Sequence, residues 1–383
     1  MSLHIRIARR MAGVIVDYLL ALPLGCVLAL LWANTAAESY FKFSNAASFV
    51  VNEVGMAFFF GLIAKEVSEA TVPGGALHPW RRAAMPMAAA LGSVAVSIAA
   101  YVLFVHSVGE HMLADGWVAA CAVDIPGTYI VARMIFGKEP AVPFLLLLAI
   151  SADAIGLACV AALQPVADVH LLAGAVLMAL ALVGAAILRR RVVRNFWPYV
   201  LGPGVLSWFA LYASGVHPAL ALVPIIPFLP HAKRDPGLFV DSDPHAHDTL
   251  TLFARFWQYP VEAVLFFFGL ANAGVPLHGL EVGSWAIPIA SLLRPIGIGV
   301  ATAIACAAGL HLPHRVGWRD IAVVGCIASI GLVFALFFSS AVMPPGTLLL
   351  EMKLGALITI FGALLAFIAA RALRVGRYAP TQP

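Results

Sequence analysis

The chain is built from apolar runs long enough to cross a bilayer, one after another, with short polar or Pro/Gly-rich segments between them. A hydrocarbon core of about 30 Å needs roughly 20 apolar residues in an α-helix. Only 11% of the residues are charged, against about a quarter in an ordinary soluble domain, so water is not the solvent for most of this surface. The sequence therefore predicts an all-α, multi-pass membrane protein.

We expect about twelve spans in one transmembrane domain covering residues 1–383. They are predicted at residues 11–33, 48–66, 83–106, 114–136, 141–163, 168–188, 196–213, 216–230, 251–273, 283–309, 319–341 and 350–372. The basic N-terminal segment leads into a run without a small-residue cleavage site, so we interpret it as a retained first helix. Residues 34–47 are expected to form a loop, and residues 231–249 a polar cytoplasmic connector.

Basic residues alternate between the predicted loops as the positive-inside rule requires. One side carries Arg6, Arg9, Arg10, Arg81, Arg82, Arg133, Lys138, Arg189, Arg190, Arg191, Arg194, Lys233, Arg234, Arg315, Arg319, Arg371, Arg374 and Arg377. The opposite side carries only Lys42 and Lys353. This asymmetry predicts a bacterial inner-membrane protein with both termini in the cytoplasm, and it accounts for the net charge of +4 without a nucleic-acid partner.

The five cysteines all lie inside apolar runs, without the spacing of a redox pair or a zinc site. We interpret them as small packing residues. Neither a disulfide framework nor a resident cofactor is expected.

Asp124 lies in the middle of the fourth predicted span. Pro126 removes a backbone donor and Gly127 loosens the helix, so a broken helix is predicted there. A break beside a carboxylate leaves free carbonyls and a half-helix terminus near the membrane centre, which is how secondary transporters coordinate cations. The alternative is that Asp124 only bonds a neighbouring helix.

Asp153 lies in the middle of the fifth predicted span and has no basic residue on its own helix. An intramembrane carboxylate must find a proton, a cation or a remote partner, so Asp153 is a candidate for exchanging a proton for a metal ion. Ser151 is a candidate for a further oxygen ligand, although a serine in such a helix more often packs or bonds its own backbone.

Arg294 lies deep in the tenth predicted span, next to Pro295. A guanidinium stays protonated, so it can hold a salt bridge but carries protons poorly. We expect a carboxylate partner, and snorkelling to the interface is the alternative. Glu53, Glu262 and Asn272 are weaker signals. His217 is a candidate pH sensor, or else a polar anchor.

Motifs along most of the chain resemble the NhaA-type sodium/proton antiporters. They are residues 58–62 with Lys65, 116–117 with 124–125, 148–150 with Asp153, 214–217, 271–275, 294–298, 323–325 with 330–331, and 353–355. The resemblance implies inverted repeats with crossed, discontinuous helices in spans four and eleven, the second broken at Gly331. It also implies alternating access that exchanges Na⁺ or Li⁺ for protons, with transient Na⁺ binding by Asp153 and Asp124.

The sequence departs from this family at the central charges, because the family places two adjacent aspartates in span five and a lysine in span ten. Alignment on residues 148–150 puts Asp153 at the second, ion-binding aspartate, with Ala152 replacing the first. Alignment on Gly156 instead makes Asp153 the first and leaves Ala154 at the ion ligand. The first alignment removes one titratable pair, as in the electroneutral branch of the wider superfamily, and we therefore hypothesise one-for-one exchange.

Two further departures concern regulation and assembly. The family's acidic pair in span two is displaced, with Ile63 and Val67 at its positions, although Glu66 remains a candidate pH sensor. Residues 34–47 are too short for the β-hairpin through which family members dimerise, so the sequence leaves a homodimer open.

The sequence leaves three alternative functions. The first is a relative of this fold with a changed or lost ion, which the single aspartate of span five favours. The second is a channel or sensor, which lacks the expected ring of carbonyls or charges. The third is an intramembrane aspartyl protease, but the sequence around Asp124 and Asp153 does not fit a shared-proton dyad. The chain is therefore not expected to be an enzyme.

Overall fold

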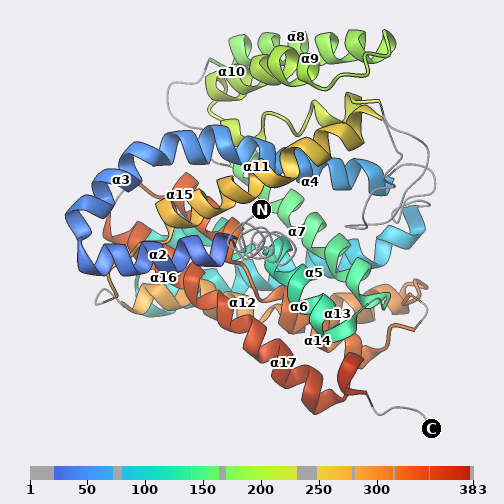
Figure 1. The fold of residues 1–383 in the computed structure, drawn as a ribbon. Coiled ribbons are helices and arrows are strands. Elements are labelled where there is room, and N and C mark those ends of the chain that lie inside the picture. Colours follow the sequence, from blue (N-terminus) through green and yellow to red (C-terminus); the bar gives the residue numbers. More distant parts are fainter. Residues whose placement is uncertain are drawn as a thin grey trace, which may run out of the picture. The chain divides into compact units, whose positions relative to one another are not determined.

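The computed structural model describes residues 21–71, 80–121, 123–137, 139–163, 170–230, 248–277, 281–313, 315–344 and 346–379 (Figure 1). Every regular element within these ranges is helical, which keeps backbone hydrogen bonds internal to each segment in a lipid solvent. The chain divides into two compact units, and each combines two segments that are distant in sequence. Unit 1 is Met1–His78 with Ala161–Gly274, and unit 2 is Pro79–Val160 with Val275–Pro383.

Unit 1 is built around the long helix α11. Its elements are α2 (Ala21–Thr35), α3 (Ala37–Phe49), the π-helical η1 (Val50–Gly55), α4 (Met56–Thr71), α8 (Leu171–Arg190), α9 (Trp197–Tyr199), the π-helical η3 (Val200–Gly204), α10 (Val205–Ala213), the 3₁₀ turns η4 (Pro218–Leu220) and η5 (Ile226–Phe228), and α11 (Thr249–Asn272). Gly25 of α2 has no side chain because a Cβ there would strike the backbone of Phe266 in α11. The two helices therefore pack backbone against backbone.

Unit 2 contains the predicted central charges. Its elements are α5 (Trp80–Val108), the 3₁₀ helix η2 (His111–Cys121), α6 (Ile125–Phe136), α7 (Ala141–Leu163), η7 (Val282–Trp285), α12 (Ala286–Leu292), α13 (Arg294–Ala307), α14 (Trp318–Ala328), α15 (Leu332–Val342), α16 (Thr347–Ile358), η8 (Thr359–Phe361), α17 (Gly362–Leu373) and η9 (Gly376–Tyr378). The most extensive helix–helix interface of unit 2 joins α5 to α13. Gly92 and Gly297 face each other there, without room for a Cβ on either residue.

Five helical stretches of the described residues are long and apolar enough to cross a membrane, or seven if each of two bent pairs is one span. The bent pairs are η2 with α6, at 51°, and α14 with α15, at 44°. These observations confirm that the described part of the chain is all-helical, of membrane-spanning type, and contains broken helices. The figure of twelve spans stays a prediction.

The prediction of a helix over residues 216–230 is wrong. Only the short turns η4 and η5 form there, separated by irregular turns. Four prolines, at positions 218, 224, 227 and 230, each remove a backbone donor from this stretch. Its apolar composition indicated a span, but its backbone cannot complete the hydrogen bonds of an α-helix.

The prediction of a loop over residues 34–47 is also wrong, because α3 occupies most of it. An ion pair of 2.7 Å between Lys42 and Glu38 follows the i,i+4 spacing of a helix. Tyr40 is buried and donates its hydroxyl to the carbonyl of Ala271 at 3.1 Å. The segment was misread because polar residues were equated with a loop, whereas here they line the exposed side of a helix.

Some predictions fall outside the described residues. They include the first part of the first span, residues 11–20, the start of the sixth, residues 168–169, and most of the polar connector, residues 231–247. Six basic residues used to predict the orientation also lie there: Arg6, Arg9, Arg10, Lys138, Lys233 and Arg234.

Candidate functional site

The breaks of the two bent pairs meet inside unit 2. The backbone N–H of Asp124, in the first break, donates to the carbonyl of Ile330, in the second, at 2.8 Å. Gly331 lies at the second break, directly before α15, and its N–H donates to Thr359 Oγ1 at 3.2 Å. The polar backbone groups that the breaks release are thus partly satisfied by each other and by one threonine.

The first break lies directly before Pro126 and Gly127 rather than at them. Both residues belong to the first turn of α6, and Asp124 precedes that turn with an extended backbone, φ −76° and ψ 99°. Proline is favoured at this position because its missing N–H would have no partner in the first turn of a helix anyway. Pro126 therefore lies in the first turn of the second half-helix, which begins at Ile125, and Asp124 is the residue directly before it.

The Asp124 carboxylate lies between the beginnings of two half-helices. It is 3% exposed and faces the backbone N–H groups of Gly127 in α6 and Val333 in α15. The positive end of each helix dipole stabilises a negative charge at this place. Its Oδ1 atom is buried and has no hydrogen-bond partner among the described residues.

Asp153 of α7 reaches the same break from another helix. It is 2% exposed, and its Oδ1 accepts the N–H of Val123 at 3.0 Å. Its Oδ2 is buried without a donor in the described part of the chain. Because Val123 is the neighbour of Asp124, the structure brings both predicted carboxylates to one break, within electrostatic range of each other.

Ser151 precedes Asp153 by two positions on the continuous helix α7, and side chains two residues apart on a helix point in different directions. Its role as a further oxygen ligand stays a prediction.

Arg294, the first residue of α13, is fully buried and contacts the ends of the two other half-helices. Nη1 donates to the carbonyl of Ala328 at 2.6 Å, and Nη2 donates to the carbonyl of Ala120 at 2.5 Å. Ala328 ends α14, and Ala120 lies in the last turn of η2. A positive charge is stabilised at helix C-termini, so Arg294 complements Asp124 at the N-termini.

The carboxylate partner expected for Arg294 is not in direct contact with it. Asp153 interacts with Arg294 electrostatically, but within the described ranges no carboxylate oxygen lies at ion-pair distance from the guanidinium. Its third acceptor is the hydroxyl of Ser97 in α5, at 3.1 Å. Sequence reasoning missed Ser97 and the two carbonyls, because backbone acceptors released by a break carry no signature in the side chains.

The chemical consequence lies in the two unpartnered carboxylate oxygens. A buried acceptor without a donor is expensive in free energy unless a proton or a cation satisfies it. A proton or a hard cation would supply the partner that Asp124 Oδ1 and Asp153 Oδ2 lack, so this pair of carboxylates can bind protons and cations in turn.

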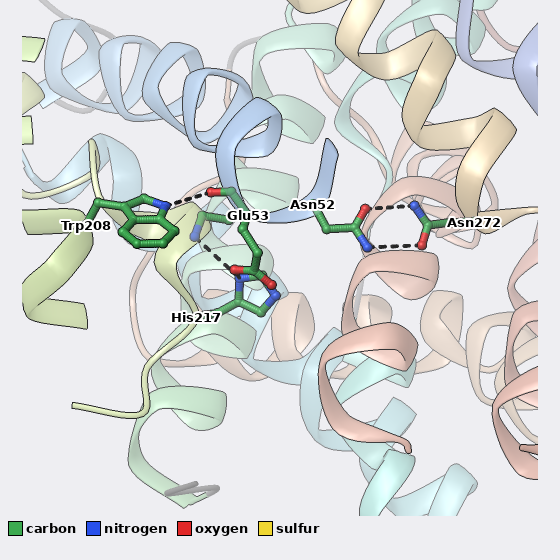
Figure 2. Close-up of polar contacts among 6 residues, drawn as sticks. Asn52, Glu53, Trp208, His217 and Asn272 are labelled. Carbon is green, nitrogen blue, oxygen red and sulfur yellow. Dashed lines mark hydrogen bonds and ion pairs between the residues drawn. The ribbon is translucent and has the colours of Figure 1, made fainter. Parts of the chain in front are cut away.

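Unit 1 holds a second polar centre, which sequence reasoning recognised only in part (Figure 2). The amide groups of Asn52 and Asn272 form two reciprocal hydrogen bonds, of 3.2 and 2.8 Å. The N–H of Trp208 donates to the carbonyl of Glu53 at 3.0 Å. Asn52 and Glu53 lie in the π-helical η1, and such local widening of a helix often occurs at functional positions.

The candidate pH sensors have different outcomes. His217 lies directly before η4, and its Nδ1 is 3.3 Å from Glu53 Oε2 (Figure 2). The pairing of two residues that were separately weak signals could not be seen in the sequence. Glu66 belongs to α4, but its side chain lies outside the described part of the structure.

A cavity of about 960 Å³ opens on unit 2 near the ends of α6 and α17 and the beginning of α14. Its charged lining comprises Glu139, Arg315, Arg319, Asp320 and Arg374. Burial, with a contribution from Asp320, raises the pKa of Glu139. None of the central carboxylates or Arg294 lines this cavity, so it is separate from the paired breaks.

The chain is similar to known proteins over nearly its whole length. A family model described as "Na+/H+ antiporter 1" matches residues 18–373. The Na⁺/H⁺ antiporter NhaA 1 of Pelobacter propionicus is 38% identical over 382 residues, covering 96% of this chain and 99% of the relative. The Na⁺/H⁺ antiporters NhaA of Desulfitobacterium hafniense and Geobacter sulfurreducens are also 38% identical, each over 96% of this chain and over 97% and 99% of their own lengths.

These matches confirm the resemblance on which the sequence analysis relied, and they confirm that the chain is of a transporter type rather than an enzyme. They also fit the broken helices and the buried carboxylates of unit 2. The chain is a multi-pass membrane protein that belongs to the NhaA family of sodium/proton antiporters.

Proposed function

We propose that this protein is a secondary transporter that exchanges Na⁺ or Li⁺ for H⁺ by alternating access, with Asp153 as the exchanging group. The observation that carries the proposal is the pair of buried carboxylate oxygens without donors, Asp124 Oδ1 and Asp153 Oδ2, at the meeting point of two helix breaks. A proton on Asp153 satisfies its free oxygen in one state. A desolvated Na⁺ bound by Asp153 and Asp124 satisfies both in the other.

The two carboxylates have different tasks in this proposal. Asp124 faces the N–H groups that begin α6 and α15, where its negative charge is useful to both half-helices. Asp153 has one backbone donor and no helix terminus of its own. Asp124 therefore keeps its charge through the cycle, while Asp153 alternates between its proton and the cation.

The exchange is proposed to be one-for-one and electroneutral. One proton leaves Asp153 for each Na⁺ that arrives, and the guanidinium of Arg294 does not titrate in the physiological range. Position 152 is fully buried and position 154 is exposed, so a neighbouring aspartate facing the interior would be expected at 152, where alanine stands. This favours the alignment in which Asp153 is the ion-binding aspartate.

We further infer twelve spans, inverted repeats and cytoplasmic termini in a bacterial inner membrane. Three segments of unit 2 predicted to be cytoplasmic line the same cavity, at Glu139, Arg315 and Arg374. Segments predicted on the other side also interact, through Glu110, Glu281 and Glu351. This grouping supports the predicted orientation of the spans.

His217 is proposed to respond to pH through its contact with Glu53. Nδ1 of His217 accepts the N–H of Ala219 at 3.4 Å, so protonation of this nitrogen would exchange that hydrogen bond for an ion pair with Glu53 across the 3.3 Å separation. Any homodimer is proposed to form without a β-hairpin, because residues 37–49 form α3.

The test is transport in liposomes that contain a pH-sensitive dye. Addition of Na⁺ or Li⁺ outside should drive protons out of the lumen and raise its pH, whereas Asp153→Asn should give a flat trace. Ser151→Ala, on the same helix, tests the predicted serine ligand separately, and transport like that of the wild type would restrict cation binding to the two carboxylates. A flat trace for every alkali cation in the wild-type protein would contradict the proposal and favour a relative with a changed ion.

A further inference from the structure

One end of unit 2 concentrates negative charge. Glu110 follows α5, Glu281 precedes η7 and Glu351 belongs to α16, yet the three carboxylates are near enough to interact electrostatically. Asp115 of η2 adds to this field, since it and Glu351 both act on the buried Tyr101. Glu110 and Glu281 lie in loops predicted on the non-cytoplasmic side, and Asp115 and Glu351 lie at the ends of predicted spans that adjoin this side.

Glu351 differs from the other acidic residues of this group because it is buried. Its side chain is 5% exposed, and its Oε2 has no hydrogen-bond partner among the described residues. The carboxylate lies against Gly283 of η7, where the first carbon of any side chain would collide with Oε2. A glycine at position 283 thus leaves room for a charge that no described residue neutralises.

Glu351 also lines a small cavity. The cavity has a volume of about 60 Å³, and its other lining residues are Pro276, Glu281, Thr347 and Leu350. A single water needs roughly 10 to 15 Å³ of such space, so a cation with a few waters fits. Carboxylate and hydroxyl oxygens are the ligands that hard cations prefer.

We propose that Glu351 and Glu281 hold a partly hydrated alkali cation, Na⁺ or Li⁺, as an entry site distinct from Asp124 and Asp153. Two carboxylates and a small cavity provide few protein oxygens, whereas Ca²⁺ takes six to eight oxygen ligands. The surrounding negative field raises the local concentration of cations at this mouth. The identity of the ion rests on the proposed antiport function, but the existence of the site does not.

Direct binding tests the site without transport. The full-length protein in detergent is titrated with Na⁺, and bound ion is measured by calorimetry or with radioactive sodium. Asp153→Asn should abolish the central site and leave one weaker site, which Asp153→Asn combined with Glu351→Gln should remove. No residual binding in Asp153→Asn, residual binding that survives in the double variant Asp153→Asn with Glu351→Gln, or residual binding of Ca²⁺ without Na⁺ would each overturn the proposal.

Transport from each side tests the role. In vesicles of known orientation, Glu351→Gln should raise the KM for Na⁺ about 3- to 10-fold on the face that carries this residue, with kcat within about twofold. The KM on the other face should not change. Glu110→Gln is the matched control, because it removes a nearby charge that does not line the cavity, and it should change KM by less than about twofold. Equal effects of both variants would reduce Glu351 to a surface charge and contradict the site.

A variant that keeps the charge distinguishes loss of the cation site from misfolding of the protein. Glu351→Asp shortens the side chain but retains the carboxylate, so it should bind Na⁺ more weakly than wild type and more strongly than Glu351→Gln in the Asp153→Asn background. A folded Glu351→Asp protein that binds no better than Glu351→Gln would contradict the proposal. If Asp153→Asn lacks transport but keeps this second binding event, both proposals stand. If wild type does not transport but binding at Glu351 persists, only the proposed function fails.

Discussion

The polar centres of the two units differ in how their buried polar side chains are hydrogen-bonded. Both lie where a helix departs from regular α geometry, at the paired breaks of unit 2 and at the π-helical η1 of unit 1. In unit 1 the amides of Asn52 and Asn272 satisfy each other in both directions. In unit 2 Asp124 and Asp153 each keep one buried oxygen without a donor. Burial of a polar side chain thus does not by itself indicate transport, and neither does a single buried oxygen without a donor, since Glu53 Oε2 and Glu262 Oε2 of unit 1 share that property. Unit 2 differs because two such carboxylates, Asp124 and Asp153, interact at one pair of helix breaks.

The largest expected effect comes from Asp153→Asn. The amide oxygen can still accept the N–H of Val123, so the fold should persist, but the site loses the charge that a cation requires. Exchange measured in proteoliposomes should fall by at least about 100-fold, with the thermal unfolding temperature nearly unchanged. Residual exchange within about tenfold of wild type would assign the exchanging group elsewhere.

Asp124→Asn should come next. It removes the negative charge that faces the beginnings of α6 and α15, which should reduce stability by about 1 to 2 kcal/mol. The exchange rate should fall by more than the loss of folded protein accounts for, because Asp124 also contributes a cation ligand. Thermal unfolding and flux measured on the same preparation separate the two effects, and unchanged flux in a destabilised protein would restrict Asp124 to a structural role.

Arg294→Lys tests the other half of the charge compensation. One ammonium group is not expected to reproduce the fork that reaches Ala120, Ala328 and Ser97, so about 1 to 3 kcal/mol of stability should be lost. Ser97→Ala removes only the contact to Nε and should cost about 1 kcal/mol. Thermal unfolding in detergent shows which variant loses more stability. A larger loss in Ser97→Ala would contradict the inference that Arg294 stabilises the structure mainly through the carbonyls of Ala120 and Ala328.

The smallest effect on transport is expected in unit 1. Asn52→Ala leaves the amide of Asn272 with fewer partners and should cost about 1 to 3 kcal/mol of stability, with the exchange rate of folded protein within about threefold. The double variant with Asn272→Ala should be less destabilised than the sum of the two single variants. Strict additivity in unfolding would show that the two amides do not act as a pair.

The sequence located the central charges because charge in an apolar run is rare and visible. It placed Asp124 near a break because Pro126 and Gly127 interrupt a helix, whereas the break at Gly331 followed from the family resemblance. It could not place Arg294 on the carbonyls of Ala120 and Ala328, because those acceptors belong to the backbone. The apolarity of residues 216–230 predicted a span, although four prolines in this stretch prevent a continuous helix. The polarity of residues 34–47 predicted a loop, although a helix forms there and packs through the buried Tyr40, which donates to the carbonyl of Ala271.

The most direct measurement of the central claim is the number of protons released for each Na⁺ bound. Purified protein in a weakly buffered solution with a pH indicator would be titrated with Na⁺ while bound sodium is counted. If Asp153 alone exchanges while Asp124 keeps its charge, wild type releases about one proton per Na⁺ at the central site, and Asp153→Asn releases none. Release of two protons per Na⁺, or release that persists in Asp153→Asn, would contradict the account.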